Sequence, residues 1–545
     1  MSTVADRIVE GLRLGGVTRL FGVPGGGSTL DLLEAARLQG VPFVLCHHEW
    51  AGCIMAAVTG ELTGRPGAAL SALGPGVTAS ATGLAHAYLD RSPMIYLSDR
   101  HPEPALGFTT HQRLDHGALV GGIVKGSTGV EVESVSDAVA HAVRLALVEP
   151  RGPVHLDLAA DVARRTALPG ASVASAESSP ILDMEALDRA GEMIRAASRP
   201  IVLAGLQCRR ADAPWLRAFC ETVPAPCLTT YKAKGAIPDP HPLALGAFTG
   251  GALEEAAVGR ADLIIAFGLD PVELIPRRWS YTAPVLSFAR CPFGELRMAA
   301  PAPAFTPAFE VVGDLGAILE ELAGRVVGRT KADWDVVEVD RLKRERQRSL
   351  EVAVPGLAPH RVVQLARELT PAGTIATVDA GAHMFPATAY WHAVEPGELL
   401  ISNGLATMGF ALPAAIAAQL VHPERRVICF TGDGGLMMAA AELETAARLR
   451  LPLLVIVFDD ATLSLIQIKQ EQMGFEGARL AYGGSDLALL ARACGLTSFV
   501  AADERQLRSA LLSALATPGP TLIDARIDAS GYRATLEIVR GAPGR

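Results

Sequence analysis

Short apolar runs alternate with helical stretches through most of this chain, and this alternation limits the folds that it can adopt. Apolar runs of four to eight residues recur, as in TIATV at 374–378, VICF at 427–430 and LLVIVF at 453–458. The segments between such runs are rich in alanine and leucine. Continuous apolar runs separated by helices are typical of parallel strands that are buried on both faces. The sequence therefore predicts an α/β fold built from doubly wound parallel sheets.

Two interruptions divide this pattern. The segment TALPGASVASAESSP at 166–180 is small, polar and proline-containing, as linkers commonly are, and a charged segment covers about 329–350. A chain of 545 residues is also too long for one hydrophobic core. We therefore expect three doubly wound domains and a short tail, at 1–165, 183–328, 355–530 and 531–545.

Charge and composition argue against several classes of partner. The formal net charge is −9, and the most basic stretch, RLKRERQR at 341–348, follows an acidic segment and is expected to be a solvated helix. No apolar run approaches the roughly 18–20 residues that a membrane-spanning helix needs. We expect neither a nucleic-acid partner nor a membrane.

The eight cysteines and the N-terminus indicate a cellular compartment. The cysteines form no CxxC pair and several lie in apolar runs, which favours reduced thiols over disulfides or a zinc site. The N-terminal segment carries Asp6, Arg7 and Glu10 and has no apolar stretch, so no signal peptide is expected. The predicted location is the cytoplasm.

Two carboxylates follow two neighbouring apolar runs. Asp433 lies in TGDGG at 431–435, and Asp460 lies in FDDAT at 458–462. Ligands of open α/β sheets bind at the carboxyl ends of the strands, and a following helix N-terminus favours phosphate oxygens. A phosphate beside carboxylates requires a cation between them, and Mg²⁺ suits this oxygen-rich setting. An alternative is that Asp433 caps a helix and Asp460 closes an Asx turn.

These motifs resemble those of the thiamine-diphosphate-dependent enzymes, closest to the acetolactate synthase branch. The stretch GDGG…ELETAARLRLPLLVIVFDDAT is similar to the motif of that family in which GDG is followed by Asn or Asp. SNGLATMGFALPAAIAA at 402–418 and VDAGAH at 378–383 are similar to two further segments of that branch. The resemblance covers essentially the whole chain and implies three doubly wound domains, with thiamine diphosphate and Mg²⁺ as cofactors.

The resemblance also implies roles for individual residues. Asp433, Asp460 and the backbone carbonyl of Thr462 would bind Mg²⁺, and Met408 would lie beneath the cofactor. Ala382 departs from the pattern, because that branch often has glutamine there. The remaining implied cofactor-binding residues are Gly381, His383, Gly404, Gly432, Gly434, Gly435, Leu465 and Ile466.

Glu49 lies in LCHHEWAGCIMAA at 45–57, where an apolar run meets an apolar helical stretch. It can be interpreted as a residue that favours the start of a helix. Its apolar flanks would also desolvate the carboxylate and favour the protonated form. By resemblance, Glu49 is the catalytic glutamate that hydrogen-bonds the aminopyrimidine ring of the cofactor. The resemblance places it opposite the cofactor of a neighbouring subunit, and thus implies a homodimer or homotetramer with active sites at the subunit interface.

The substrate is indicated only weakly. His111 and Gln112, in TTHQRLDH at 109–116, match a catalytic segment of the branch, in which His111 replaces a phenylalanine. This segment is also similar to that of carboxyethylarginine synthase, a relative with a phosphorylated donor. Lys469 replaces a tryptophan that helps to select the acceptor, and a lysine there favours an anionic group. Each basic residue could equally be structural or exposed.

The resemblance implies an enzyme that decarboxylates a 2-oxo acid and ligates the resulting enamine to an acceptor carbonyl. The segment GLDPVELIP at 268–276 is similar to that of FAD-independent members, so FAD is not expected. The alternatives are a carboxyethylarginine synthase-like transferase that uses a phosphorylated donor, and a simple 2-oxo acid decarboxylase. A non-catalytic regulatory relative is disfavoured, because Glu49, Asp433 and Asp460 are all retained.

Overall fold

A computed structural model describes residues 2–167, 181–275, 277–296, 304–327, 333–476 and 479–541. The chain forms two compact units, which are described separately. The first unit comprises Met1–Ser178, Gly404–Pro423 and Ala439–Leu451, and the second comprises Ser179–Asn403, Glu424–Met438 and Pro452–Arg545.

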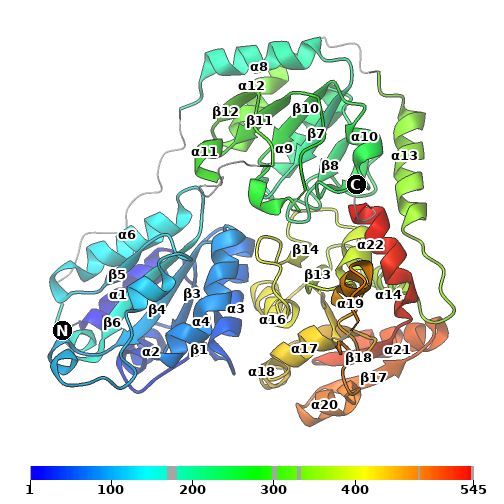
Figure 1. Cartoon of the computed structure of the whole chain (residues 1–545). Coiled ribbons are helices and arrows are strands. Elements are labelled where there is room, and N and C mark those ends of the chain that lie inside the picture. The colour runs from blue at the N-terminus through cyan, green and yellow to red at the C-terminus, as the bar shows by residue number, and fades with distance from the viewer. Residues whose placement is uncertain are drawn as a thin grey trace. The chain divides into compact units, whose positions relative to one another are not determined.

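The first unit contains a parallel six-stranded sheet in the order β2-β1-β3-β4-β6-β5 (Figure 1). Its strands are β1 (Leu20–Val23), β2 (Phe43–Leu45), β3 (Gly67–Ser71), β4 (Met94–Arg100), β5 (Ser127–Gly129) and β6 (Pro153–Ala159). Its helices are α1 (Val4–Leu14), α2 (Ser28–Leu38), α3 (Glu49–Thr63), α4 (Pro75–Leu89), α5 (His116–Val120), α6 (Val135–Leu147), α7 (Ala160–Ala163), α16 (Ala411–Val421) and α18 (Glu442–Arg448). The short 3₁₀ turns are η1 (Glu103–Gly107) and η2 (Val132–Ser134).

Helices cover both faces of this sheet. Ile8 of α1, Leu32 of α2 and Val139 of α6 are fully buried in one core with residues of the strands. On the other face, α3 packs against α4 and α16. Helix α1 begins where the sequence provides a capping box, in which Thr3 and Asp6 exchange hydrogen bonds. Helix α3 ends at Gly64, whose left-handed backbone (φ 67°) suits glycine.

The second unit contains two further parallel six-stranded sheets. The central sheet has the order β12-β11-β10-β7-β8-β9 and helices on both faces. Its strands are β7 (Pro200–Ala204), β8 (Cys227–Thr229), β9 (Ala244–Ala247), β10 (Leu263–Phe267), β11 (Val285–Ala289) and β12 (Phe309–Val312). Its helices are α8 (Met184–Ala196), α9 (Ala213–Thr222), α10 (Glu255–Val258), α11 (Phe293–Leu296), α12 (Leu315–Val326) and α13 (Val336–Ser349), with the 3₁₀ turn η3 (Pro271–Glu273).

The C-terminal sheet has the order β14-β13-β15-β16-β18-β17. Its strands are β13 (Ile375–Val378), β14 (Leu399–Ile401), β15 (Val427–Gly432), β16 (Leu453–Asp459), β17 (Thr497–Ala501) and β18 (Thr521–Arg526). Its helices are α14 (Pro359–Leu369), α15 (Met384–Tyr390), α17 (Asp433–Ala439), α19 (Ser464–Gln472), α20 (Leu487–Ala493), α21 (Glu504–Ala516) and α22 (Tyr532–Arg540), with the 3₁₀ turn η4 (Ala529–Gly531).

These sheets confirm the predicted fold class of three doubly wound parallel sheets. The buried runs at 375–378, 427–432 and 453–459 become β13, β15 and β16. Parts of three predicted segments lie outside the described residues: 168–180 of the first linker, 328–332 at the second break, and 542–545 of the tail. Over the ranges that the structure describes, no helix combines the length and apolar character that crossing a bilayer requires.

Candidate active site

Three neighbouring strands of the C-terminal sheet bring the predicted cofactor residues to one edge. β15 lies between β13 and β16, and all three run parallel. The chain reverses its winding between β13 and β15, because β14 lies beyond β13 while β15 lies on its other side. The crevice at such a reversal is the usual ligand site of an open α/β sheet. Gly381 and His383 follow β13, Asp433 follows β15, and Asp460 follows β16.

Asp433 is the first residue of α17 and is 9% exposed. Its Oδ1 accepts the N–H of Gly434 at 2.7 Å. Burial raises the pKa of Asp433 to about 6, and the negative charges of Asp460 and Asp459 add to this rise. Three carboxylates therefore interact unfavourably at this edge, and a divalent cation would relieve that repulsion.

Asp460 lies in a turn that its own side chain stabilises. Its Oδ1 accepts the N–H of Thr462 at 3.1 Å, and its Oδ2 accepts the hydroxyl of Ser464 at 2.5 Å. Ala461 between them has a left-handed backbone, with φ 52°. Burial, and then the charge of Asp459, raise the pKa of the Asp460 carboxyl. The Asx turn considered from the sequence is thus present, and it leaves Asp460 in electrostatic contact with Asp433.

His383 contributes a polar atom that lacks a partner. Its Nε2 is buried and has no hydrogen bond within the described part of the chain. Burial lowers the pKa of His383 to about 3, so the ring is neutral, and the ring stacks on Phe458 with centroids 5.3 Å apart. A Cβ on Gly432 would lie 3.2 Å from this ring, and one on Gly381 would lie 2.8 Å from it. The ring therefore needs glycine on both sides, and its Nε2 can bond a ligand oxygen.

The other predicted residues of the second unit lie around this edge or along α19. Ala382 is buried in the core of the C-terminal domain. A Cβ on Gly435 would lie 2.3 Å from Oδ2 of Asp379, so only glycine fits at that position. Leu465 is half-buried, Ile466 is exposed, and Lys469 lies half-buried one turn further along α19.

Two further residues near the acids were not predicted from the sequence. Ser464 binds Asp460, and its position four residues later, at the start of a helical stretch, is a local signal. Tyr532 is buried in α22, where burial and then the charges of Asp460 and Asp433 raise its phenol pKa. Because Tyr532 is far from both acids in the sequence, no local pattern predicts that it lies near them.

The protein side chains alone do not surround a metal ion. Across the described ranges, no group of three or more histidine, cysteine, aspartate or glutamate side chains is placed to hold one. Asp433 and Asp460 would therefore need further oxygen ligands, such as the Thr462 carbonyl and oxygens of a bound ligand. A divalent cation that bridges carboxylates to phosphate oxygens satisfies this requirement.

In the first unit, Glu49 is the first residue of α3, and its side chain is 18% exposed. The preceding segment is fixed by Glu442 of α18, whose Oε1 accepts the N–H groups of His47 (2.9 Å) and His48 (3.2 Å). Glu442 is 1% exposed, and burial raises the pKa of its carboxyl. The sequence does not reveal this anchor, because almost 400 residues separate the partners.

Gly404 and Met408 also belong to the first unit. The N–H of Gly404 donates to Oδ1 of Asp90 at 3.4 Å, and a Cβ on Gly404 would lie 2.8 Å from that of Leu89. Met408 is half-buried, and Ala406 before it has a left-handed backbone, with φ 53°.

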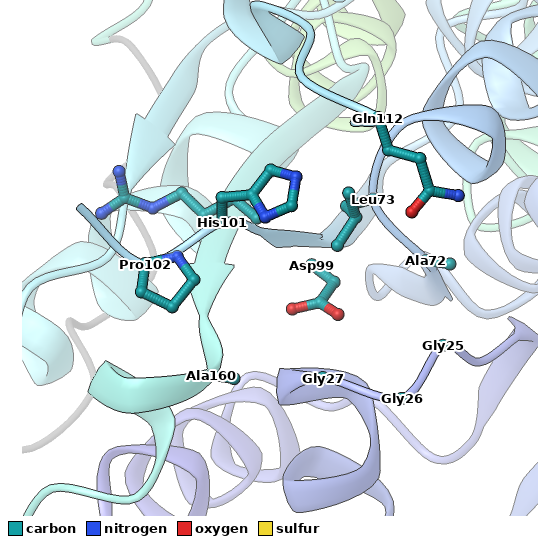
Figure 2. Close-up of a pocket in the computed structure, with 11 residues that line it drawn as sticks. Gly25, Gly26, Gly27, Ala72, Leu73, Asp99, His101, Pro102, Gln112 and Ala160 are labelled. Atoms are coloured by element: carbon teal, nitrogen blue, oxygen red, sulfur yellow. The ribbon is translucent and has the colours of Figure 1, made fainter. Parts of the chain in front are cut away.

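A cavity of about 370 Å³ opens in the first unit beside Gln112 (Figure 2). Figure 2 shows the side chains of Gln112, His101 and Asp99 around it, above the backbone of Gly25–Gly27. Oδ1 of Asp99 accepts both the N–H (3.0 Å) and the hydroxyl (2.8 Å) of Ser28. These two bonds hold the turn at Gly25–Gly27 in place.

The two residues predicted from TTHQRLDH differ in placement. Gln112 lines the cavity and has a left-handed backbone, with φ 54°. The side chain of His111 is exposed, and its carbonyl accepts the Nε2–H of His101 at 2.8 Å. Glu49 is not among the residues that line this cavity. Strain of the kind seen at Gln112 is concentrated at functional positions in proteins.

Comparisons with known proteins agree with this geometry. Residues 2–119, 187–322 and 379–525 match the N-terminal thiamine pyrophosphate binding domain, the central domain and the C-terminal thiamine pyrophosphate binding domain of thiamine pyrophosphate enzymes.

Curated relatives match along almost the whole chain. Acetolactate synthase from Bacillus subtilis (strain 168) is 29% identical over 539 residues, covering 96% of this chain and 93% of the relative. The catabolic acetolactate synthase of Raoultella terrigena is 29% identical, with 96% and 95% covered. The large subunit of acetolactate synthase isozyme 1 from Escherichia coli (strain K12) is 30% identical, with 97% and 94% covered. The chain therefore belongs to the thiamine pyrophosphate enzyme family, and it is a thiamine-diphosphate-dependent enzyme similar to the acetolactate synthases.

Proposed function

We propose that this protein is a Mg²⁺- and thiamine-diphosphate-dependent carboligase that decarboxylates a 2-oxo acid and joins the product to an acceptor carbonyl. The observation that carries the proposal is the pairing of Asp433 with Asp460 at the winding reversal of the C-terminal sheet. The similarity to acetolactate synthases supports the choice of reaction.

The residues at this edge fit a diphosphate and a cation. Asp433, Asp460 and the Thr462 carbonyl would hold Mg²⁺, which would compensate the negative charges that add to the effect of burial on the pKa of Asp433. The buried Nε2 of His383 lacks a partner among the described residues and would bond a diphosphate oxygen. The glycines at 381 and 432 keep that ring accessible, because a Cβ at either position would press against it.

Bound thiamine diphosphate supplies the carbanion chemistry that protein side chains lack. Glu49 would exchange a proton with the heterocycle through its largely buried carboxyl group. Glu442 keeps that carboxyl group in position, because it binds the two backbone N–H groups just before it. Gln112 would orient substrate from the wall of its cavity.

Carbon dioxide release from a panel of 2-oxo acids, with and without aldehyde acceptors, tests the proposed reaction. We expect release from at least one acid, and a ligated product when an acceptor is present. Release with only the free aldehyde as product would indicate a simple decarboxylase. Consumption of glyceraldehyde phosphate without release would instead indicate the carboxyethylarginine synthase-like reaction that His111 and Lys469 favour.

We further propose that the central domain binds no FAD. The carboxyl group of Glu273 lies where the central sheet reverses its winding between β7 and β10, and its Oε2 accepts the N–H groups of Leu206 (2.8 Å) and Asp270 (3.2 Å). A side chain of the protein thus uses backbone donors that could bind a nucleotide phosphate. Flavin absorbance of the purified protein would contradict this proposal.

Assembly and location are part of the same proposal. We infer a homodimer or homotetramer with active sites at the subunit interface, in agreement with the sequence resemblance, and sedimentation at equilibrium tests it. A single sedimenting monomer with full activity would contradict it. A cytoplasmic location is supported by the eight cysteines, which are all free thiols and of which seven are buried.

A further inference from the structure

A series of five hydrogen-bonded polar side chains, of which three are buried, lies in the first unit and ends at the backbone of Gly74. His155 is 0% exposed, Ser98 is 1% exposed and His116 is 5% exposed. The contacts, in order, are Ser127 Oγ to His155 Nδ1 (2.8 Å), His155 Nε2 to Ser98 Oγ (2.7 Å), Ser98 Oγ to Asp157 Oδ1 (2.5 Å), Asp157 Oδ1 to His116 Nδ1 (3.1 Å), and His116 Nε2 to Gly74 N (3.2 Å).

The chemistry of the partners fixes the proton of His116. The backbone N–H of Gly74 can only donate, so Nε2 of His116 must carry a free lone pair. The carboxylate of Asp157 can only accept, so Nδ1 of His116 must carry the hydrogen. His116 is thus a neutral imidazole with its hydrogen on Nδ1, which links a carboxylate to a backbone donor.

The other half of the chain is fixed by the same rule. Ser98 donates its hydroxyl hydrogen to Asp157 and therefore accepts from Nε2–H of His155. His155 then accepts the hydroxyl hydrogen of Ser127 at Nδ1. Burial lowers the pKa of His155 to about 4, in agreement with a neutral ring. Each hydrogen bond between these side chains therefore has a defined donor and acceptor, and together the bonds favour a single arrangement of the side chains.

Gly74, which His116 holds, lies against Gln112. Gly74 precedes α4 with φ 62°, and a Cβ on it would lie 3.0 Å from both Cβ and the carbonyl oxygen of Gln112. Gln112 has φ 54°, a conformation that a residue with a side chain keeps only where its surroundings impose it. His116 acts on Gln112 from two sides, because it follows Gln112 closely along the chain and also anchors Gly74.

The chain of side chains also reaches the cavity at a second point. Asp99 lines the cavity and follows Ser98 directly, and the charge of Asp157 contributes to raising the Asp99 pKa, after the larger effect of burial. The groups that face His116 are thus Asp157, His155 and the Gly74 backbone, with Asp99 beyond Asp157. Asp99 and Gln112 both line the cavity, so the bonded side chains are linked to its wall at two points.

We propose that His116 is a positioning residue, which holds the Gly74 backbone and thereby keeps Gln112 oriented toward substrate. This inference rests on the proposed function for its kinetic consequence. The sequence gives no sign of this role, because the bonded residues lie between 28 and 59 positions apart.

Three substitutions separate the two bonds of His116. His116→Phe removes both bonds, and His116→Asn keeps a donor near Nδ1 but loses the acceptor for Gly74. His116→Gln places an amide oxygen near the position of Nε2 and can keep that acceptor. We expect the phenylalanine and asparagine variants to lose about 10- to 100-fold in kcat/KM for carbon dioxide release from pyruvate or the preferred 2-oxo acid. The glutamine variant should retain most of the activity.

Two further measurements report the geometry without depending on turnover. Nitrogen-15 NMR of the wild-type histidines should show a neutral ring with hydrogen on Nδ1 whose signal disappears in His116→Phe. Amide exchange followed by mass spectrometry should become at least about tenfold faster at Gly74 in the phenylalanine and asparagine variants. Thiamine diphosphate affinity, measured by calorimetry, should not change.

His241 provides a matched control. Its Nε2 faces Glu221 at 3.0 Å, and its Nδ1 accepts the N–H of Leu243 at 3.2 Å, so His241→Phe removes the same two kinds of bond. We expect that variant to keep the wild-type kcat/KM. Wild-type kcat/KM in His116→Phe and His116→Asn, or hydrogen on Nε2 of His116, would overturn this inference alone. A wild-type protein that releases no carbon dioxide from any 2-oxo acid would overturn the proposed function together with it.

Discussion

Asp433 and Asp460 follow adjacent parallel strands, and the charge of Asp460 contributes to the pKa of Asp433, which burial raises to about 6. Two acids in this relationship destabilise the protein unless something compensates their charge. A bound cation would provide that compensation, so relief of the repulsion would add to the affinity for the cation. This relationship explains why the sequence places carboxylates after two neighbouring apolar runs.

Asp433→Asn should stabilise the cofactor-free protein. The amide keeps the shape of the side chain but removes a buried charge that two further carboxylates repel. We expect the free energy of unfolding to rise on the order of 1 kcal/mol at neutral pH, after allowance for solvent screening. Urea unfolding in EDTA measures it, with Asp486→Asn as control, since Asp486 is an exposed helix cap of the same domain. A variant less stable than wild type would contradict the assigned repulsion.

Glu49→Gln should slow proton exchange at C2 of bound thiamine diphosphate while leaving affinity for the cofactor nearly unchanged. The amide cannot supply the proton that a carboxyl group exchanges with the heterocycle. We expect a loss of about 100-fold or more, the usual range for general acid–base catalysis. Proton NMR of C2 hydrogen–deuterium exchange measures the rate. Glu34→Gln, which changes an exposed residue paired with Arg37, serves as control. Equal rates in the wild type and the Glu49 variant would refute the role of Glu49.

Glu442→Met should destabilise the first unit more than Glu444→Met does. Glu442 is buried and accepts the N–H groups of His47 and His48, whereas Glu444 on the same helix forms exposed pairs with His47 and Arg448. Methionine keeps the length of the side chain but leaves both N–H groups without an acceptor, which costs more than the loss of exposed ion pairs, so we expect a difference of about 1–2 kcal/mol. Urea unfolding of the three proteins compares them. Equal losses would show that Glu442 is no anchor.

Glu273 should make stability depend on pH. Burial raises its pKa from 4.5 in the unfolded chain to about 8 in the folded protein. The folded state therefore keeps a proton that the unfolded state loses between these values. The contribution of Glu273 to the free energy of unfolding is therefore fully present below pH 4.5. It is lost as pH rises to about 8, at up to about 1.4 kcal/mol per pH unit.

Glu273→Gln should remove this part of the pH dependence. The amide oxygen can still accept the N–H groups of Leu206 and Asp270, but it does not titrate. We expect the variant to gain stability over wild type as pH rises from 5 to 8, and the difference to level off above pH 8. Thermal melting across this range measures it. Parallel curves for the two proteins would disprove the prediction.

Much of the fold could be predicted because its signals are local. The apolar runs that end before Asp379, Asp433 and Asp460 specify buried strands, and parallel pairing brings their carboxyl ends together. The same logic indicated where a ligand would bind. The glycines beside His383 were predicted as cofactor residues by resemblance, while the structure shows that they also leave room for its ring.

The rest depends on contacts that no local pattern encodes. Glu442 binds His47 across the first unit, and Tyr532 comes from the last helix to lie near both acids. The bond from His116 to Gly74 follows from the packing of a short helix and a loop. Gln112 was predicted by resemblance, but its left-handed backbone is visible only in three dimensions.

Calorimetric titration of thiamine diphosphate into the cofactor-free protein, with and without Mg²⁺, shows whether Asp433 and Asp460 bind the cofactor through a cation. We expect saturable binding that requires Mg²⁺ in the wild type. The affinity should be at least about tenfold weaker in Asp433→Asn and in Asp460→Leu. Asp486→Asn should bind the cofactor as the wild type does. Equally tight binding without a divalent cation, or undiminished affinity in both variants, would contradict binding through a cation.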